Sequence, residues 1–274
     1  MFDVSSSLSF SSADPVAAAD PVSSPAPPVA ALATAPVLEG ISFSELGLAA
    51  PLLDALKRLE ISHPTPVQAQ AIPLLLAGRD LIASAPTGTG KTAAFLLPSL
   101  QRLAVAAAAS AKAATVAAAL PANAAAVSAT GSASSLVATT VKGSRRGFGA
   151  RVLVLTPTRE LAQQVAKHSQ ALSRSMQRVT TVCVTGGESY FLQNKLLSAP
   201  HEILVATPGR LMDQMDQGRV DLSRVEVLVL DEADRMLDMG FADDVIAIAK
   251  ALPPQRQTVC FTATLSRAVR ALAG

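Results

Sequence analysis

Short apolar runs alternate with helical stretches along the chain beyond residue 150. The runs are almost wholly apolar, rich in Val and Leu, and cover residues 152–155, 179–184, 203–206, 225–230 and 258–261. Stretches with helical spacing separate most of them, at residues 160–172, 210–217 and 243–252. Continuous apolar strands are typical of a sheet that is buried on both faces. The pattern therefore predicts an α/β domain with a parallel sheet and helices on both faces.

The same pattern begins upstream. Leucines recur at helical spacing between residues 46 and 59, the segment 63–68 ends that helix, and a second helix starts near residue 67. The apolar run at residues 81–83 predicts one more strand. Ligands of such sheets bind at the carboxyl ends of the strands, so we expect the chemistry in the segments that follow these runs.

Two low-complexity segments interrupt the pattern. Residues 1–38 are rich in Ser, Ala and Pro, and we expect a disordered tail there. The segment from about 105 to 149 is Ala-, Ser- and Thr-rich and ends in a basic cluster that includes Lys142, Arg145 and Arg146. Its alanines could form a helix, but no amphipathic stripe would dock one, so we expect a flexible surface insertion. The remaining sequence over 39–274 is predicted to form one domain.

Composition excludes several classes of protein. The net charge of +2 is too small to indicate a nucleic-acid partner by bulk electrostatics, so such binding must come from local groups. Cys183 and Cys260 each lie in an apolar run, which indicates buried, inert thiols, and no Cys/His cluster has metal-ligand spacing. The long Ala-rich tract is interrupted by Lys112 and Pro121, and the N-terminus has no early basic residue. We expect no membrane span and a cytoplasmic location.

The glycine-rich stretch after residue 83 is the first candidate site. It reads S-A-P-T-G-T-G-K-T and lies between an apolar run and a helical pattern, which is the context of a phosphate-binding loop. Its glycines let backbone N–H groups approach phosphates, and the following helix adds a favourable dipole. A turn that needs glycine only for its geometry is the alternative. The cofactor-binding candidates are Ala85, Pro86, Thr87, Gly88, Thr89, Gly90, Lys91 and Thr92.

Three carboxylates follow the apolar run that ends at residue 230, and they form the second candidate site. Asp231 can hold Mg²⁺ opposite the Thr92 hydroxyl, while Lys91 would reach the β- and γ-phosphates. Glu232 is placed to orient or deprotonate an attacking water. A solvated acidic turn is the alternative, but a phosphate loop in the same sheet disfavours it. Together the two sites predict hydrolysis of a nucleoside triphosphate, with Glu232, Lys91 and Asp231 as catalytic residues.

The sequence Asp231-Glu-Ala-Asp234 resembles the name-giving motif of the DEAD-box RNA helicases, and the other motifs of their first lobe stand in family order. The resemblance covers roughly residues 41–103 and 151–273 and implies a P-loop, RecA-like fold with ATP and Mg²⁺ as cofactors. Gln68 matches the glutamine that reads the adenine edge, and Phe43 matches an isolated upstream aromatic. Ile61 replaces the aromatic that stacks on adenine in the family.

The resemblance also implies an RNA-binding surface without sequence specificity. Three motifs match: Pro157, Thr158 and Arg159; Gly186 and Gly187; and Thr207, Pro208, Gly209 and Arg210. Their backbone N–H groups, hydroxyls and arginines suit phosphates and 2′-hydroxyls. Taken alone, Arg159 and Arg210 would be surface residues paired with Glu160 or Asp213. Thr262 and Thr264 match the motif that couples hydrolysis to strand separation, together with Asp234.

Two functional hypotheses follow. The first is the ATP-binding lobe of an ATP-dependent RNA helicase, and residues 231–241 are most similar to its bacterial RhlE-type branch. The second is a module that binds nucleotide or RNA without turnover. Residues 1–274 contain no match to the family's second RecA-like lobe, which we expect in the complete protein. The sequence names neither the RNA substrate nor a protein partner.

Overall fold

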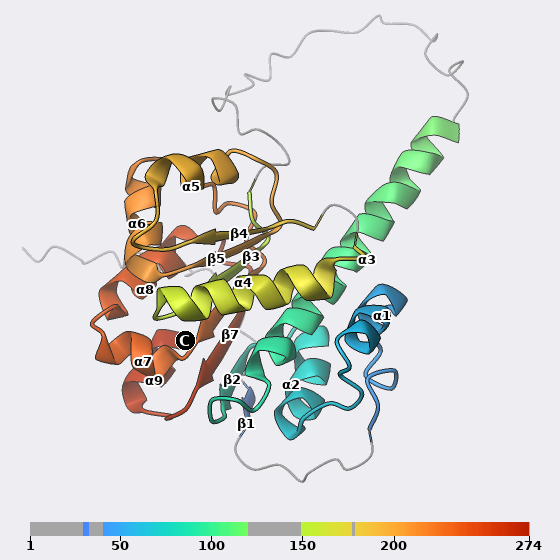
Figure 1. Ribbon diagram of the computed structural model, residues 1–274, viewed down its shortest axis with the longest axis horizontal. Coiled ribbons are helices and arrows are strands. Elements are labelled where there is room, and N and C mark those ends of the chain that lie inside the picture. Colours follow the sequence, from blue (N-terminus) through green and yellow to red (C-terminus); the bar gives the residue numbers. More distant parts are fainter. Residues whose placement is uncertain (1–29, 33–40, 120–148, 177–178, 274) are drawn as a thin grey trace, which may run out of the picture.

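The computed structural model describes residues 30–32, 41–119, 149–176 and 179–273. Within these ranges, seven parallel strands form one sheet in the order β1-β2-β7-β6-β3-β5-β4 (Figure 1). The predicted parallel α/β fold is confirmed. The strands are β1 (Ala30–Leu32), β2 (Leu81–Ser84), β3 (Val152–Leu155), β4 (Thr181–Val184), β5 (Ile203–Ala206), β6 (Val227–Asp231) and β7 (Gln257–Thr262).

Helices cover both faces of the sheet. Among the helices of the described ranges, the first four pack on one face and the last five pack on the other, and each group encloses its own apolar core. The helices are α1 (Ala50–Arg58), α2 (Pro66–Leu76), α3 (Lys91–Ala119), α4 (Arg159–Ser173), α5 (Tyr190–Leu197), α6 (Pro208–Asp216), α7 (Ala233–Asp238), α8 (Ala242–Ala251) and α9 (Arg267–Ala273).

Strand β3 shows why the central strands are apolar throughout. Val152 and Val154 belong to the core beneath the first four helices, whereas Leu153 and Leu155 belong to the core on the other face. All four side chains are essentially inaccessible to solvent. Each such side chain contributes about 1.5–3 kcal/mol when it is buried. A polar residue at any of these positions would therefore be costly on either face.

Two predictions about the low-complexity segments were wrong in part. Residues 30–32, within the predicted disordered tail, form β1, whose backbone pairs in parallel with β2 at the edge of the sheet. Helix α3 runs on to Ala119 instead of ending near residue 104. Alanine has the highest helix propensity, so a helix anchored at its first half can continue without an apolar stripe. The rest of both segments lies outside the described residues.

The strand register brings the ends of the strands to one edge. Ser84 pairs with Thr262, and Asp231 pairs with Phe261 on the same strand. On the other side of β6, Leu155 is level with both Leu230 and Ala206. The segments that follow β2, β3, β5, β6 and β7 therefore emerge side by side, as expected for the carboxyl edge of a parallel sheet.

Helix α3 contains a stretch, Lys91–Ala109, that is long and apolar enough to cross a membrane by length and composition alone. However, 44% of that stretch is buried inside the domain. Phe95, Leu96 and Leu97 are fully buried in the core beneath the first four helices. We therefore assign α3 to the core of the domain.

Candidate nucleotide site

The glycine-rich segment links β2 to α3 as a tight loop at the carboxyl edge. The backbone of Gly88 and Gly90 is left-handed, with φ of 85° and 91°, which side-chain-bearing residues rarely adopt. A Cβ atom at Gly90 would also collide with the Gln68 amide. The Thr89 hydroxyl donates to the Pro86 carbonyl at 2.8 Å and closes the loop on itself. Lys91 is the first residue of α3, so the loop leads directly to the N-terminus of a helix.

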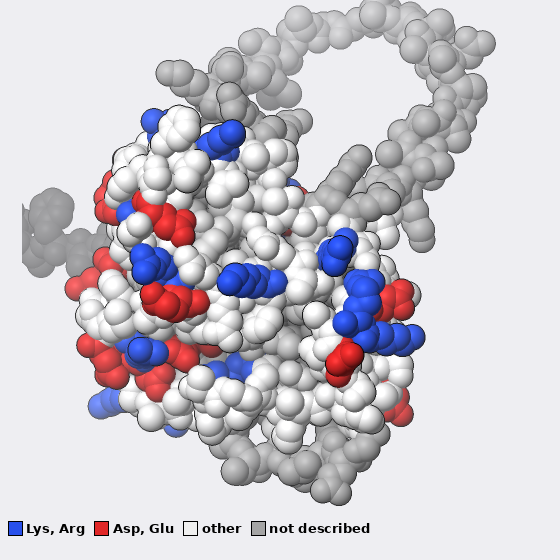
Figure 2. Space-filling view, viewed as in Figure 1, with Lys and Arg blue, Asp and Glu red and all other residues white. Residues whose placement is uncertain are grey.

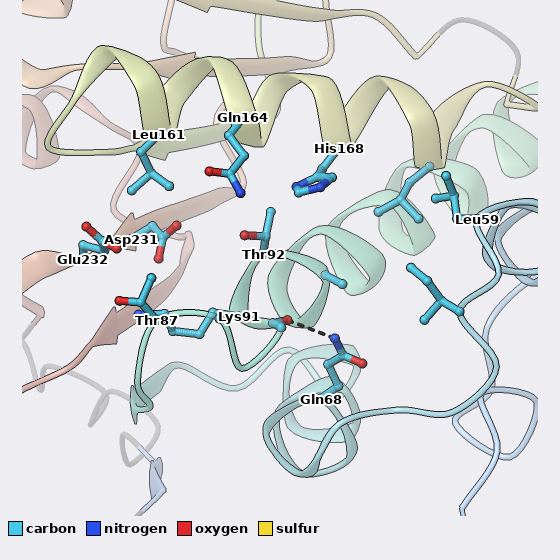
Figure 3. Close-up of a pocket in the computed structure, with 15 residues that line it drawn as sticks. Leu59, Gln68, Thr87, Lys91, Thr92, Leu161, Gln164, His168, Asp231 and Glu232 are labelled. Atoms are coloured by element: carbon cyan, nitrogen blue, oxygen red, sulfur yellow. Dashed lines mark hydrogen bonds between the residues drawn. The ribbon is translucent and has the colours of Figure 1, made fainter.

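A pocket of about 330 Å³ opens beside this loop, and its two ends differ in chemistry (Figure 3). Thr87, Lys91, Asp231 and Glu232 gather at one end. Leu59 lies at the other end, and Ile61 and Leu172 are further apolar side chains that line the pocket. The volume lies in the range of small-molecule sites. A ligand with a charged tail and a flat apolar head matches such a pocket.

Lys91 and Asp231 are the buried charges of the polar end. They are only 6% and 2% exposed, and neither the Lys91 Nζ nor the Asp231 Oδ1 has a hydrogen-bond partner among the described residues. Burial raises the pKa of Asp231 to about 6, the nearby Lys91 opposes that rise, and Glu232 adds to it. Unpaired buried atoms facing a pocket are the arrangement that a phosphate and a divalent cation would complete. The residues present thus fit Mg²⁺, which the Thr92 hydroxyl and the Asp231 carboxylate would hold.

Glu232 has an unusual backbone. Its φ of 55° and ψ of 52° place it in the left-handed region, where it caps α7. Its carboxylate lines the pocket and forms an ion pair with Arg235 at 3.4 Å. Such a conformation in a residue other than glycine costs about 1–3 kcal/mol and is common at functional sites. The turn aims the carboxylate into the pocket immediately after the buried strand β6.

Asp234 connects the acidic motif to the end of β7. Its Oδ2 accepts hydrogen bonds from the Thr264 backbone N–H at 2.8 Å and from the Thr264 hydroxyl at 2.9 Å. Burial tends to raise the pKa of Asp234, but hydrogen bonds from Thr264 and its neighbours outweigh burial and lower it. The Thr262 hydroxyl in turn donates to the Thr264 carbonyl at 2.7 Å. The three residues predicted to act in coupling are therefore in direct contact.

Gln68 connects the pocket to the phosphate loop. Its side-chain amide donates to the Gly90 carbonyl at 3.0 Å, and its Oε1 accepts from the Thr65 backbone N–H at 3.1 Å (Figure 3). The second bond is half of a capping box that starts α2. Gln68 is therefore fixed at the pocket wall by the two segments that it joins.

Phe43 and Ile61 occupy different positions. Ile61 lines the nucleotide pocket, as predicted. Phe43 is 3% exposed and lines a second, adjacent pocket with Leu53 and Leu56, to which Ile61 also contributes. Phe43 packs in the core and is not among the residues that line the nucleotide pocket. The structure therefore places Phe43 beside the nucleotide pocket and not in its lining, and its contact with a nucleotide stays a prediction.

The predicted RNA motifs meet on one side of the carboxyl edge. The Arg159 guanidinium lies so close to Gly187 that a Cβ atom there would be 2.6 Å from its Nη1. Thr158 starts α4 by accepting from the Leu161 backbone N–H at 3.3 Å. Figure 2 shows Lys and Arg interspersed with Asp and Glu over the face that α4 occupies, so no single broad basic surface forms there.

Arg210 is held within the protein. Its guanidinium donates to the Glu188 carbonyl and to the Gln193 side chain, both at 3.1 Å, and lies 4.0 Å from the centre of the Tyr190 ring. Its side chain is 10% exposed and is 3.7 Å from Asp213. The pairings with acidic neighbours that were the alternative for Arg210 and Arg159 both occur, with Asp213 and Glu160 respectively. RNA contact by these residues stays a prediction.

Sequence reasoning missed one wall of the pocket. Leu161, Gln164, His168 and Leu172 of α4 all line it. Their spacing of three, four and four residues places them on one face of the helix, and Figure 3 shows the first three pointing toward the loop. The helical spacing of these residues could be recognised in the sequence, but nothing in the sequence indicated that this face of α4 lies opposite the phosphate loop.

The fold and site together define a P-loop nucleoside-triphosphate-binding domain. A family model described as DEAD/DEAH box helicase matches residues 65–272. The chain therefore belongs to the DEAD/DEAH box helicase family.

Characterised relatives agree with this assignment. The chain is 41% identical over 229 residues to the ATP-dependent RNA helicase DeaD of Escherichia coli, covering 84% of this chain and 30% of the relative. It is 40% identical over 225 residues to SrmB of the same organism, covering 82% and 42%. A crystal structure of a DEAD box protein from Methanococcus jannaschii matches with a TM-score of 0.65 and 31% identity, over 85% of this chain and 52% of that one. The chain thus spans about a third to a half of these proteins.

Proposed function

We propose that the chain is the ATP-binding lobe of an ATP-dependent RNA helicase, which couples ATP hydrolysis to sequence-independent binding and unwinding of RNA. One observation carries the proposal: Lys91 of the phosphate loop and Asp231 and Glu232 of the acidic motif line the same pocket. The names of DeaD and SrmB as ATP-dependent RNA helicases support it. The sequence of residues 231–241 favours the RhlE-type branch within the family.

Each polar side chain of the pocket has a role in this proposal. The Lys91 ammonium neutralises charge on the β- and γ-phosphates, and the loop's backbone N–H groups hold the phosphate chain. Glu232 accepts a proton from the attacking water. Mg²⁺, when bound by Thr92 and Asp231, neutralises further phosphate charge. Gln68 reads the adenine edge. Because its side chain also donates to the Gly90 carbonyl, a change in the position of Gln68 when adenine binds would reach the phosphate loop.

The RNA-binding part of the proposal rests on the surface around Arg159 and Gly187. Arg159 is exposed and adjacent to the glycine pair. Arg210, fixed by Tyr190 and Gln193, would hold that loop in place and leave the phosphate contacts to backbone N–H groups and to Arg159. Groups of this kind contact phosphates and do not read base edges, so binding would not depend on sequence.

Coupling would run through Asp234 and Thr264. A displacement of Asp234 at the carboxyl edge would reach the segment after β7, because Thr264 donates two hydrogen bonds to the Asp234 carboxylate. We also propose that unwinding needs a second RecA-like lobe, since the relatives extend well beyond the matched region.

Two substitutions test the proposal. Lys91→Ala should abolish ATP turnover in a two-lobed version of the protein, because the positive charge on the β- and γ-phosphates is lost. Glu232→Gln should keep ATP binding while stopping hydrolysis, because the metal site remains and the base is removed. Hydrolysis is measured by phosphate release with single-stranded RNA, and binding by calorimetry. Turnover near the wild-type rate in either variant would contradict the assignment.

A non-catalytic module that binds nucleotide or RNA is the second candidate. The absence of any arginine among the described residues that line the pocket favours it for residues 1–274 by themselves. ATP binding without turnover, even beside a second lobe, would identify this class.

A further inference from the structure

His168 lines the nucleotide pocket from the side opposite the phosphate loop. Lys91 and Asp231 fix the phosphate end of the pocket, so the base must extend toward the apolar end at Leu59 and Ile61. His168 lines the pocket from α4, one helical turn before Leu172. Figure 3 shows it pointing down into the pocket, with Gln68 on the opposite wall.

His168 is free to contact a ligand. It is exposed, and its imidazole has no hydrogen bond or ion pair with another side chain or backbone group in the part of the chain that the structure describes. Among the described residues that line the pocket there is no Phe, Tyr or Trp, so the imidazole is the one aromatic ring present. Position 61, where an aromatic would stack on a base, holds an isoleucine that offers only dispersion contacts.

We propose that His168 is a nucleotide-binding residue whose imidazole packs against the adenine and provides the aromatic surface that Ile61 does not. The inference rests on the proposed function, because it requires ATP in this pocket. The base would then lie between α4 above and the Gln68 amide below, with Ile61 closing its outer end. This arrangement contributes to affinity for the base and leaves the phosphate contacts unchanged.

The test compares binding of magnesium–ATP with binding of magnesium–tripolyphosphate by the full chain, measured by calorimetry. Removing a stacking side chain costs on the order of 1–3 kcal/mol per base, so His168→Ala should weaken ATP binding about fivefold or more and leave tripolyphosphate binding unchanged. His168→Phe should bind ATP at least as tightly as the wild type. Adding Ile61→Phe to His168→Ala should recover much of the lost affinity.

Gln170→Ala is the matched control, since Gln170 is an exposed α4 residue that does not line the pocket. It should bind both ligands like the wild type. Equal ATP affinity in His168→Ala and wild type would overturn the inference, and so would an equal loss for ATP and tripolyphosphate. A loss of ATP affinity in His168→Phe would overturn it independently of how well the alanine variant folds. Failure of the wild type to bind ATP would instead contradict the proposed function itself.

Discussion

Lys91 and Asp231 are charged side chains that the fold buries without giving the Lys91 Nζ or the Asp231 Oδ1 a hydrogen-bond partner among the described residues. Burial of an unpaired charged group is costly, and a ligand that supplies the partner removes that cost. The free domain therefore holds its phosphate-binding groups in place before the nucleotide arrives. Binding then requires little reorganisation of these two side chains.

The raised pKa of Asp231 predicts a pH dependence of nucleotide binding. In the proposed function the Asp231 carboxylate holds Mg²⁺ and must be ionised to do so, whereas burial raises its pKa to about 6. Below that pH binding must first release a proton, so affinity for magnesium–ATP should fall up to about tenfold for each further pH unit. Calorimetry between pH 5 and 8 measures the fall. Asp231→Asn should bind magnesium–ATP more weakly and should lose the part of the pH dependence that comes from Asp231. The part that comes from protonation of ATP itself should be the same in both proteins.

The two cysteines should be unreactive in the folded protein. Burial raises the pKa of Cys183 to about 11, to which Glu188 adds, and burial raises that of Cys260 to about 12. The thiolate is the reactive form, so at pH 8 only about 0.1% of Cys183 would be reactive. Labelling with iodoacetamide, followed by mass spectrometry, should be slow in native protein and complete after denaturation. Rapid labelling of either cysteine in the native state would contradict these environments.

The sequence predicts the contiguous motifs well because each carries several informative residues together. The loop around Gly88 and Gly90 and the carboxylates after β6 were predicted to share one site, and the structure brings both to the lining of one pocket. His168 was missed because a single helical position reveals nothing about what it faces. Phe43 was assigned to the nucleotide by family order, but it belongs to the core and lines the adjacent pocket instead.

At the scale of elements, strands made wholly of large apolar residues were predictable, and weakly patterned elements were not. The strands at 152–155 and 203–206 were predicted to the residue, since each is fully buried. Strand β1 is three residues long with two alanines, and only its partner β2 identifies it as a strand. Helices α5 and α7 have eight and six residues, too few for a clear helical period.

The second half of α3 should be dispensable for folding. Leu103 is the last fully packed residue of the helix, and residues 107–109 are exposed. Replacing residues 107–147 with a short Gly/Ser linker should leave the melting temperature nearly unchanged, because no core contact among the described residues is lost. Circular dichroism should show less helix per molecule. A large drop in melting temperature would show that the removed segment packs on the domain.

At the scale of the whole molecule, the described residues that line the pocket include no arginine, although phosphoryl transfer commonly uses a second positive charge besides the loop lysine. Lys91 is the only Lys or Arg among the described residues that line it. An arginine finger is typically worth about 10³–10⁵ in rate. Residues 1–274 alone should therefore hydrolyse ATP very slowly and respond weakly to RNA, whereas fusion to a second RecA-like lobe should restore RNA-stimulated turnover.

That prediction is measured by phosphate release from residues 1–274 and from the fusion, each with and without single-stranded RNA. Lys91→Ala in the fusion is the control for turnover by a contaminating enzyme. Robust RNA-stimulated hydrolysis by residues 1–274 would contradict it and would indicate that a second copy contributes the missing arginine.

Helix α3 begins at the phosphate loop and extends for 29 residues, so at 1.5 Å per residue its far end lies about 40 Å away along the helix axis (Figure 1). New sequence added at that end would lie far from the sheet and the site, so natural selection against such additions should be weak. The helix tip is therefore a place where this lobe can acquire segments during evolution. It is equally a place to graft a fluorescent reporter or an affinity handle at a distance from the carboxyl edge of the sheet.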